Sequence, residues 1–384
     1  MHNKVVIVAS INIADRNAPA VHLLSLAKQL QQNGHQIVLI APEYDGTLPV
    51  SLPKNSFILE MTKRLRLPGI PNSLNVLAQL PALWRYRRYR ALYVRTGPMS
   101  IVLTVAAKIF GYQRLVLEVN GWLADELQVM GYPQFLTSLV NKMQFAELAI
   151  ASSVRVVTPG LKAILVSGSI EKQKIQVIGN GTDLDVFQPL DRTACRERCK
   201  LRKETTYLVF AGNLAEWQDL TTLFKALPIV LKLGYDVELL ILGEGRERDR
   251  FTQEAEQEGI AARVHFLGAH DLATINQYFN VADVGVAPFR KARNSRIGLS
   301  PLKVRDYAAA GLPVVTSNLP GLDTFKGERW ITLAEPENAK ELAVAIIEQL
   351  NAPREQHRLA ARAYAERNFA WADVVRQLEQ HIWG

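Results

Sequence analysis

The chain has 384 residues, 48% of them hydrophobic and 21% charged, with a formal net charge of +8. This describes a globular protein of two domains rather than one. No apolar run reaches the roughly 20 residues of a membrane span, and the start lacks a signal-peptide cleavage site, so we expect a cytoplasmic protein. The two cysteines, Cys195 and Cys199, have no second pair beside them, which excludes a zinc-binding motif.

Short apolar runs alternate with helical patterns along the first half. A helix is expected at residues 20–34, closing at Gly34, and predicted strands lie at residues 4–10, 36–42, 91–95, 114–120 and 154–160. Such alternation is typical of parallel βαβ units. The first half therefore predicts one doubly wound domain.

The same alternation of apolar runs and helical patterns resumes after residues 177–205. This stretch is rich in turn-forming and charged residues, and we interpret it as a linker. Predicted strands follow at residues 206–212, 237–245, 263–268, 282–289 and 312–318. The last sixteen residues form an amphipathic helix with Trp371, Val374, Leu378 and Ile382 at core-facing spacing. The chain is thus predicted to be α/β, with two Rossmann-like doubly wound domains facing a cleft.

The known phosphate-binding loops are missing. The sequence "GEGRER" at residues 243–248 lacks the third glycine of a dinucleotide fingerprint, and no P-loop pattern occurs. A simple dehydrogenase or a P-loop enzyme is therefore disfavoured.

Positive charge gathers in the first half. Residues 1–180 hold 19 Lys and Arg against 9 Asp and Glu, whereas the remainder holds 26 against 28. Within residues 84–90, Trp84, Tyr86 and Tyr89 interleave with arginines. This mixture suits an anionic membrane or an anionic acceptor, and a solvated helix end with packed aromatic stems is the alternative. No nucleic-acid-binding motif accompanies the charge.

One helix in the second half starts with a cation. Ser300 is placed to cap it, Pro301 suits its first position, and Gly311 is placed to end it. Lys303 would then lie in the first turn, where the helix dipole disfavours a positive charge by about 0.3–1 kcal/mol. Either an anion offsets this cost, or an exposed lysine tolerates it.

The runs "KIQVIGNGTDLDVFQP", "FAGNLAEWQDLTTLFKAL", "LLILGEGRERDRF", "VHFLG", "YFNVADVGVAPF" and "DYAAAGLPVV" follow one another in the second half. In order and spacing they resemble the family 4 glycosyltransferases of GT-B architecture. The resemblance implies an acceptor-side domain of residues 1–185 plus a crossing helix at 370–384, and a nucleotide-sugar domain of residues 186–369.

The resemblance also identifies donor-side candidates. The family's paired glutamates fall here at Gly298 and Asp306, so only Asp306 keeps an acid, as a catalytic candidate that can accept hydrogen bonds from the ribose hydroxyls, and Gly298 cannot supply the first glutamate's contact with the transferred sugar. The usual arginine and lysine for the donor phosphates fall at Asn213 and Gln218, after Gly212. We expect Lys303 first and Arg296 second as replacement cations. Residues Leu299, Ser300, Pro301 and Leu302 match the turn whose backbone approaches the donor diphosphate, and Gly243, Phe266 and Leu267 match the base pocket.

On the acceptor side, "LEVNGWLADE" ends a predicted strand. Glu118 is a candidate general base if its pKa is raised, with helix capping or positioning as the alternative. Asn120 and Glu126 follow it. Arg16, Asn17 and His22 occupy the family's first loop, whose usual glycines are replaced here.

The resemblance implies a retaining transfer of a sugar from a nucleotide-diphosphate donor to a glycan or lipid-linked acceptor, with no metal ion or other cofactor. The triplet Asp183 to Asp185 is interpreted as a turn rather than a metal site. Two alternatives stay open: a non-catalytic binding subunit of a glycan-assembly complex, and a nucleotide-sugar epimerase or hydrolase.

Overall fold

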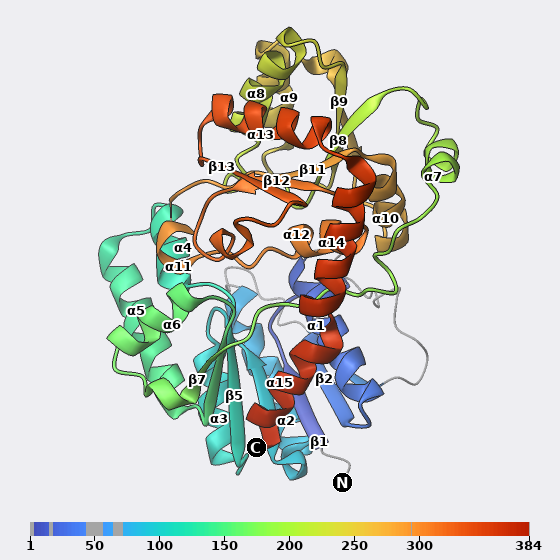
Figure 1. Ribbon diagram of the computed structural model, residues 1–384. Coiled ribbons are helices and arrows are strands. Elements are labelled where there is room, and N and C mark those ends of the chain that lie inside the picture. The colour runs from blue at the N-terminus through green and yellow to red at the C-terminus, as the bar shows by residue number, and fades with distance from the viewer. Residues whose placement is uncertain (1–3, 15–17, 44–56, 64–71, 293, 384) are drawn as a thin grey trace. The chain divides into compact units, whose positions relative to one another are not determined.

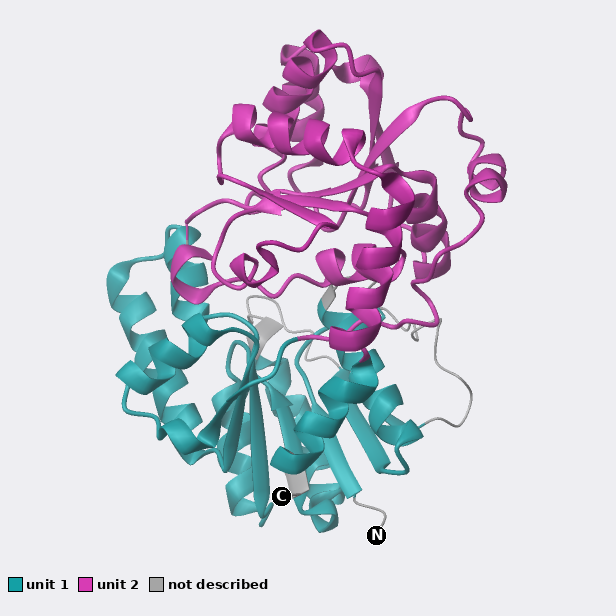
Figure 2. Ribbon diagram, in the orientation of Figure 1, with its two compact units in different colours: residues 1–179, 371–384 teal, residues 180–370 magenta. Residues whose placement is uncertain are grey.

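The computed structural model describes the chain except for residues 1–3, 15–17, 44–56, 64–71, 293 and 384. The chain forms two compact units (Figure 2). Unit 1 contains residues 1–179 and 371–384, and unit 2 contains residues 180–370. The first junction thus lies a few residues before the boundary expected at 185, and the second lies at the start of the expected crossing helix.

Unit 1 is built on a seven-stranded parallel sheet in the order β3-β2-β1-β4-β5-β6-β7 (Figure 1). Its strands are β1 (Lys4–Val8), β2 (Gln36–Pro42), β3 (Ile58–Thr62), β4 (Ala91–Arg95), β5 (Arg114–Val119), β6 (Ser153–Val156) and β7 (Ile175–Val177). Its helices are α1 (Ala18–Gln32), α2 (Leu80–Arg85), α3 (Ser100–Ile109), α4 (Leu123–Val129), α5 (Gln134–Ile150), α6 (Pro159–Ser167) and α15 (Trp371–Trp383), with short 3-10 helices η1 (Asn72–Gln79), η2 (Arg87–Tyr89) and η3 (Lys172–Lys174).

Unit 2 is built on a six-stranded parallel sheet in the order β10-β9-β8-β11-β12-β13. Its strands are β8 (Thr206–Ala211), β9 (Val237–Leu242), β10 (Val264–Gly268), β11 (Val284–Ala287), β12 (Val314–Ser317) and β13 (Ile331–Ala334). Its helices are α7 (Arg192–Arg198), α8 (Leu220–Lys232), α9 (Arg248–Gln257), α10 (Leu272–Val281), α11 (Asn294–Ile297), α12 (Leu302–Ala309), α13 (Ala339–Asn351) and α14 (Arg354–Asn368), with 3-10 helices η4 (Ala261–Arg263) and η5 (Asp323–Phe325).

All ten strands that the alternation predicts are present in these parallel sheets, and the α/β fold class is confirmed. The alternation did not predict β3, β7 and β13, which lie at three of the four sheet edges. Edge strands are buried less and carry a weaker apolar signal; β3 and β7, for example, are only partly buried.

The C-terminal helix α15 completes the core of unit 1. It packs against α1 and β5, and Trp371, Val374 and Leu378 are buried as predicted. Val375 is also buried, and the side chain of Ile382 lies outside the described part of the chain. The buried face of α15 therefore belongs to the same apolar cluster as side chains of β1, β2 and α1.

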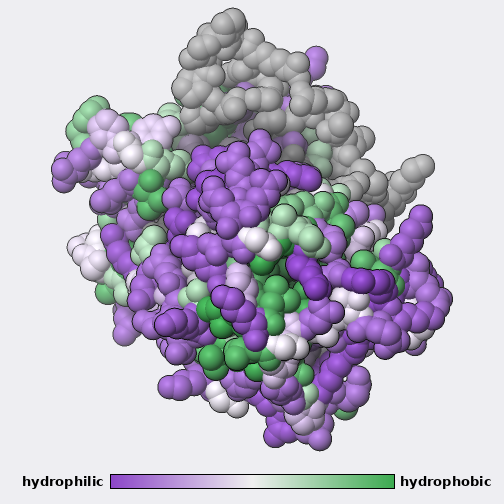
Figure 3. Space-filling view, turned by 90° about the horizontal axis from the view of Figure 1, so that it is seen from above, coloured by the Kyte–Doolittle hydropathy of each residue, from purple (hydrophilic) through white to green (hydrophobic). Residues whose placement is uncertain are grey.

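Apolar side chains cover both faces of the unit 2 sheet. One cluster joins β8 and β11 to α10, α12 and α14, and the other joins them to α8, α9 and α13. Seen from above, the molecule presents a mostly hydrophilic face with a smaller hydrophobic patch (Figure 3). No helix in the described part of the chain is long and apolar enough to span a bilayer.

The basic and aromatic stretch flagged by composition forms α2 and η2 in unit 1. Trp84 is half-exposed and meets Phe110 edge-on, with ring centroids 5.1 Å apart, while the Arg87 guanidinium stacks over its ring. Arg85 pairs with Glu60 at 2.6 Å. The stretch thus combines packed aromatic stems with an exposed basic surface.

Candidate functional site

The sheet of unit 2 reverses its strand order between β8 and β11, which lie side by side. In open α/β sheets, ligands bind beyond the carboxyl ends of the strands at such a switch point. Gly212 follows β8 and has a φ of 147°, in the region that favours glycine. Gly243 follows β9 with a φ of 140°, and a Cβ there would overlap the Gly212 carbonyl oxygen. The loops beyond the sheet are therefore tightly interlocked.

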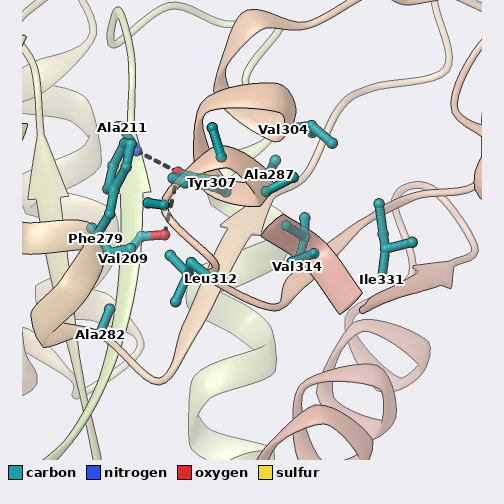
Figure 4. Close-up of a cluster of buried hydrophobic side chains, with 14 of the residues drawn as sticks. Val209, Ala211, Phe279, Ala282, Ala287, Val304, Tyr307, Leu312, Val314 and Ile331 are labelled. Carbon is teal, nitrogen blue, oxygen red and sulfur yellow. Dashed lines mark hydrogen bonds between the residues drawn. The ribbon is translucent and has the colours of Figure 1, made fainter. Parts of the chain in front are cut away.

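Helix α12 is fixed to this end of the sheet by Tyr307. Its hydroxyl accepts a hydrogen bond from the Ala211 amide at 2.8 Å and donates to the Val209 carbonyl at 3.4 Å (Figure 4). The ring is fully buried and meets Phe279 edge-on. Because side chains four residues apart share one helix face, Tyr307 also directs the side chain at position 303 towards β8.

Lys303 reaches the switch point. Its Nζ lies 3.7 Å from the centroid of the Phe210 ring on β8 and 5.5 Å from that of Phe289, which follows β11. The ammonium donates a hydrogen bond to Gln218 Oε1 at 2.6 Å. Within the described chain, no carboxylate lies within ion-pair distance of it. Burial lowers the pKa of Lys303 well below its ordinary value.

The other predicted phosphate ligands differ in position. Gln218 is buried, and its side chain accepts a hydrogen bond from Lys303. The position that holds a lysine in the family therefore lies beside Lys303 in this chain. Asn213 is exposed, with its Oδ1 close to Gly245. Arg296 is exposed on the short helix α11.

The start of α12 differs from the sequence prediction. Pro301 is the N-cap residue rather than the first helical residue, and it makes no side-chain cap. The predicted Ser300 cap is wrong, because its hydroxyl accepts a hydrogen bond from Arg305 Nη2 at 2.8 Å instead. The Leu299 amide donates to the Pro320 carbonyl, so it is not free for a phosphate. Gly311 follows the helix with a φ of 71°, as expected of a glycine after a C-cap.

Asp306 binds a segment of its own unit. Thr182 Oγ1 donates to its Oδ1 at 2.5 Å, and the Thr182 amide donates to the carbonyl of Phe369. Burial raises the pKa of Asp306 to about 7, although the Thr182 hydrogen bond opposes the rise. The carboxyl thus ties α12 to the segment around Thr182, which in turn is bonded to the backbone at Phe369.

The remaining donor candidates lie near the same end of the sheet. Gly298 is buried with a φ of 75°, a conformation that a glutamate would adopt only with strain. Phe266 and Leu267 lie at the end of β10, and both are half-buried. Leu302 is the first residue of α12.

In unit 1, Glu118 lies at the carboxyl end of β5 within a buried polar cluster. Its Oε1 is 3.0 Å from Arg155 Nη1 and 2.5 Å from His22 Nε2 on α1. Arg155 also donates to the Tyr93 hydroxyl at 3.0 Å, to the Ile178 carbonyl at 3.0 Å and to the carbonyl of Gly179 at 2.7 Å. Glu118 and Arg155 are fully enclosed.

The expectation of a raised Glu118 pKa is wrong. Burial alone would raise it, but the His22 ring and the Arg155 guanidinium stabilise the carboxylate and hold the pKa of Glu118 below its ordinary value. A fully enclosed ionised carboxylate with a guanidinium partner is a poor proton acceptor, so the positioning alternative fits better. Burial also lowers the pKa of His22, although Glu118 opposes this, and the ring packs on Trp371 with centroids 5.2 Å apart.

The other acceptor-side candidates are dispersed. Asn120 follows β5, and its buried Nδ2 has no hydrogen-bond partner in the described structure. Glu126 lies in the first turn of α4. Arg16 and Asn17 lie outside the described residues. Asp183 accepts hydrogen bonds from the amides of two following residues, which confirms the predicted turn.

Sequence reasoning missed Arg155, Tyr93 and Thr182. The signal for Arg155 was a charged residue inside the apolar run "SVRVV", where a lone arginine needs a buried partner. No comparable signal marked Thr182. In the described residues, no group of three His, Cys, Asp or Glu side chains is placed to hold a metal ion.

Comparison with known proteins identifies the family. The model of "Glycosyltransferase Family 4" matches residues 19–186, and that of "Glycosyl transferases group 1" matches residues 205–352. The chain belongs to the family 4, group 1 glycosyltransferases. The two models together cover most of both units of this glycosyltransferase.

Curated relatives of the glycosyltransferase are distant. A D-inositol 3-phosphate glycosyltransferase of Geodermatophilus obscurus is 30% identical over 54% of the chain and 47% of its own length. A glycogen synthase of Mycobacterium tuberculosis is 23% identical over 92% of the chain and 88% of its own length. The chain spans less than half the length of the inositol-phosphate enzyme.

Solved structures share the fold of the glycosyltransferase. Sucrose-phosphate synthase from Thermosynechococcus elongatus superimposes with a TM-score of 0.81 at 19% identity, over 99% of this chain and 98% of the other. Anabaena HepE, solved in complex with UDP and glucose, gives 0.78 at 18% identity over 99% of both chains. These neighbours confirm the GT-B architecture of two Rossmann-like domains.

Proposed function

We propose that this glycosyltransferase binds a nucleotide-diphosphate sugar on unit 2, with Lys303 contacting the diphosphate. The observation that carries the proposal is the side-chain nitrogen of Lys303 at the β8/β11 switch point, with no carboxylate partner among the residues that the structure describes. Lys303 is partly buried. Desolvating a cation without a counter-charge is costly, and an anionic ligand would reduce that cost. The UDP bound to Anabaena HepE is an anion of this class.

Lys303 takes over the charge that the family carries elsewhere. Gln218 stands at the position of the family's phosphate-binding lysine, yet its side chain touches the Lys303 ammonium. The side-chain nitrogen of Lys303, which projects from α12, would therefore bind the donor phosphates at the position where the side chain of a lysine at residue 218 would bind them. The amides at the start of α12 add the favourable end of a helix dipole.

The proposed reaction transfers the sugar with retention of its anomeric configuration to a glycan or lipid-linked acceptor on unit 1. The bond from the anomeric carbon to the phosphate oxygen breaks, a bond to the acceptor oxygen forms, and the acceptor proton passes to the leaving phosphate. Lys303 would neutralise the charge that develops on that phosphate, which is the role a metal ion serves elsewhere. The cytoplasmic location expected from the sequence stays a prediction.

Ligand-induced stabilisation tests the donor site. UDP, GDP and ADP are each added to the wild type and to Lys303→Met, with Lys291→Met as a matched control because Lys291 is an exposed lysine of the same unit. At about 100 times its dissociation constant, a ligand stabilises the folded state by roughly 2.7 kcal/mol. We expect one nucleotide to shift the wild type and Lys291→Met equally and Lys303→Met much less. Equal shifts in all three proteins would refute the role of Lys303.

Proton uptake gives a second test. Burial lowers the pKa of Lys303, and a bound diphosphate would raise it again, so binding is coupled to proton uptake over the pH range between the two pKa values. Titration calorimetry in two buffers of different ionisation enthalpy measures this uptake. We expect it in the wild type, together with affinity that falls as the pH rises, and we expect neither in Lys303→Met.

A non-catalytic binding subunit is the second candidate, because Gly298, Asn213 and Gln218 lack the family's charged side chains. An epimerase or hydrolase of the same fold is a further alternative. Transfer assays with and without acceptor separate the three: acceptor-dependent product, also formed in the presence of EDTA, supports the transferase. Products formed without acceptor indicate the epimerase or hydrolase, and nucleotide binding without turnover indicates the subunit.

A further inference from the structure

Four arginines of unit 2 gather around one carboxylate. Arg192 and Arg196 lie one turn apart on α7, and Arg354 and Arg358 lie one turn apart on α14, so each pair shares one helix face. The Oδ1 atom of Asp283 lies 2.6 Å from Arg192 Nη2 and 3.6 Å from Arg354 Nη1. Its Oδ2 atom lies 3.5 Å from Arg196 Nη2, and Arg358 interacts electrostatically with both Asp283 and Arg192. We name these four arginines the arginine cluster.

The arginine cluster lies at the opposite end of the unit 2 sheet from Lys303. The Asp283 amide donates a hydrogen bond to the Tyr207 carbonyl at 2.8 Å, and the Tyr207 amide donates to Asp283 Oδ2 at 2.9 Å. Tyr207 is the second residue of β8. Phe210, whose ring faces the side-chain nitrogen of Lys303, lies three residues, or about 10 Å, further along the strand. Helices α7, α10 and α14 cover one face of the sheet beside the cluster (Figure 1), which is thus separate from the proposed donor site.

The cluster carries more positive charge than its neighbours neutralise. Among the described residues, the carboxylates within ion-pair distance of it are Asp283 and Glu355, and Glu355 is 80% exposed with its Oε1 4.0 Å from Arg358 Nε. Four guanidiniums against two carboxylates leave a surplus of two positive charges. Burial lowers the pKa of both Arg196 and Arg358, and the Arg192 guanidinium lowers both further. An anion at the cluster would therefore reduce an existing electrostatic cost.

The guanidiniums of the cluster also keep hydrogen-bond donors unused. The Nε atoms of Arg192 and Arg354 are buried and have no hydrogen-bond partner in the described structure. The same holds for Nε of Arg196, a side chain that is 4% exposed, but its Nη2 already donates to the carbonyls of Thr205 at 2.8 Å and Val281 at 3.3 Å. Arg196 therefore serves mainly the fold. The side chains of Arg192 and Arg354 are 27% and 29% exposed, which leaves them accessible to a small solute.

We propose that the arginine cluster binds a dianionic phosphate group, carried by a small phosphate monoester or by inorganic phosphate. The planar fork of a guanidinium matches two phosphate oxygens, which makes arginine the favoured residue for such an anion. Two negative charges would balance the surplus of two positive charges. Arg192, Arg354 and Arg358 supply the donors from two helices. The site goes beyond the proposed function, because it uses none of the residues assigned to the donor or the acceptor.

Titration calorimetry of the full chain with inorganic phosphate tests the site, and a second series with glycerol 3-phosphate separates the free ion from a monoester. Chloride keeps the ionic strength constant, so that general screening does not change during the titration. The cluster variants are Arg354→Met and Arg192→Met. The matched control is Arg263→Met, because Arg263 is a partly exposed arginine of unit 2 that pairs with Asp236 instead of Asp283.

We expect saturable phosphate binding to the wild type and equal binding to the control. The affinity should fall about tenfold or more in each cluster variant, since a charge-assisted hydrogen bond is lost. Tighter binding of glycerol 3-phosphate would identify a monoester as the ligand, and tighter binding of inorganic phosphate would identify the free ion. Two cluster variants are made so that, if one fails to fold, the other still tests the site.

Lys303→Met separates the arginine cluster from the proposed donor site. Phosphate binding should survive Lys303→Met, and the nucleotide-induced stabilisation should survive Arg354→Met. Three results would overturn the proposal: no saturable phosphate binding to the wild type, equal affinity in the wild type and the cluster variants, or binding that is lost in Lys303→Met and kept in the cluster variants. The first two would leave the cluster as an ion-pair network around Asp283, and the third would assign the phosphate to the donor site.

Discussion

Replacing Glu118 by leucine removes the negative centre of the buried cluster in unit 1. Its side chain is fully enclosed, and it stabilises an arginine that is only 1% exposed. Breaking a buried pair by removing one partner costs about 3–5 kcal/mol, since the other charge is left uncompensated. For a unit of this size, each kcal/mol lowers the melting temperature by about 2–4 °C. Glu118→Leu should therefore lower the unfolding transition of unit 1 by roughly 6–20 °C.

A double-mutant cycle with Arg155→Met separates the ion pair from its other bonds. The double variant removes both members of the Glu118–Arg155 pair. It still leaves Arg95, whose Nη1 lies 3.8 Å from Glu118 Oε2, without that carboxylate, and it leaves the carbonyls of Ile178 and Gly179 without their donor, at about 1–3 kcal/mol each. We expect the double variant to be less destabilised than the sum of the two single variants by at least about 2 kcal/mol. Urea unfolding followed by tryptophan fluorescence measures all four proteins. A Glu118→Leu cost below about 1 kcal/mol, or strictly additive variants, would refute the assignment of Glu118 as a structural and positioning residue.

Three further predictions concern stability. Gly243→Ala should cost about 1–3 kcal/mol more than Gly234→Ala in urea unfolding, because both have positive φ but only the first Cβ overlaps backbone, at Gly212. Burial raises the pKa of Glu147 from 4.5 to about 7, so the folded state holds a proton that the unfolded state has lost, and stability should fall as the pH rises between these values. Glu147→Gln should flatten that slope, and an unchanged slope would contradict it. Leu378→Ala in α15 should cost about 2–5 kcal/mol by opening a cavity in unit 1, as thermal unfolding would record.

Sequence patterns predicted the sheets better than the sites. Strands such as β1 and β9 are buried on both faces, so their apolar runs are unambiguous. Lys303 stood out because a cation in a first helical turn is unfavourable, and its placement beside Gln218 follows from Tyr307, whose contacts with β8 no local pattern reveals.

The error at Glu118 has a physical cause. A carboxylate at a strand end suggests a raised pKa only if its surroundings are apolar, and the guanidinium that neutralises it comes from β6, in a different part of the sequence. Ser300 failed as a cap for a similar reason. Its hydroxyl accepts a hydrogen bond from Arg305 in the following turn. A local sequence pattern does not decide whether a serine hydroxyl binds a backbone amide of the helix start or a nearby side chain.

The insertion of unit 2 between residues 179 and 371 imposes an order of synthesis on the chain. Unit 2 is contiguous and leaves the ribosome complete, whereas unit 1 waits for its last fourteen residues, of which α15 supplies the buried Val375 and Leu378. Until then, the apolar surfaces of α1 and β5 that α15 covers are open to water. A stop codon directly after residue 370 would therefore damage the unit that was made first and leave intact the one that was made second.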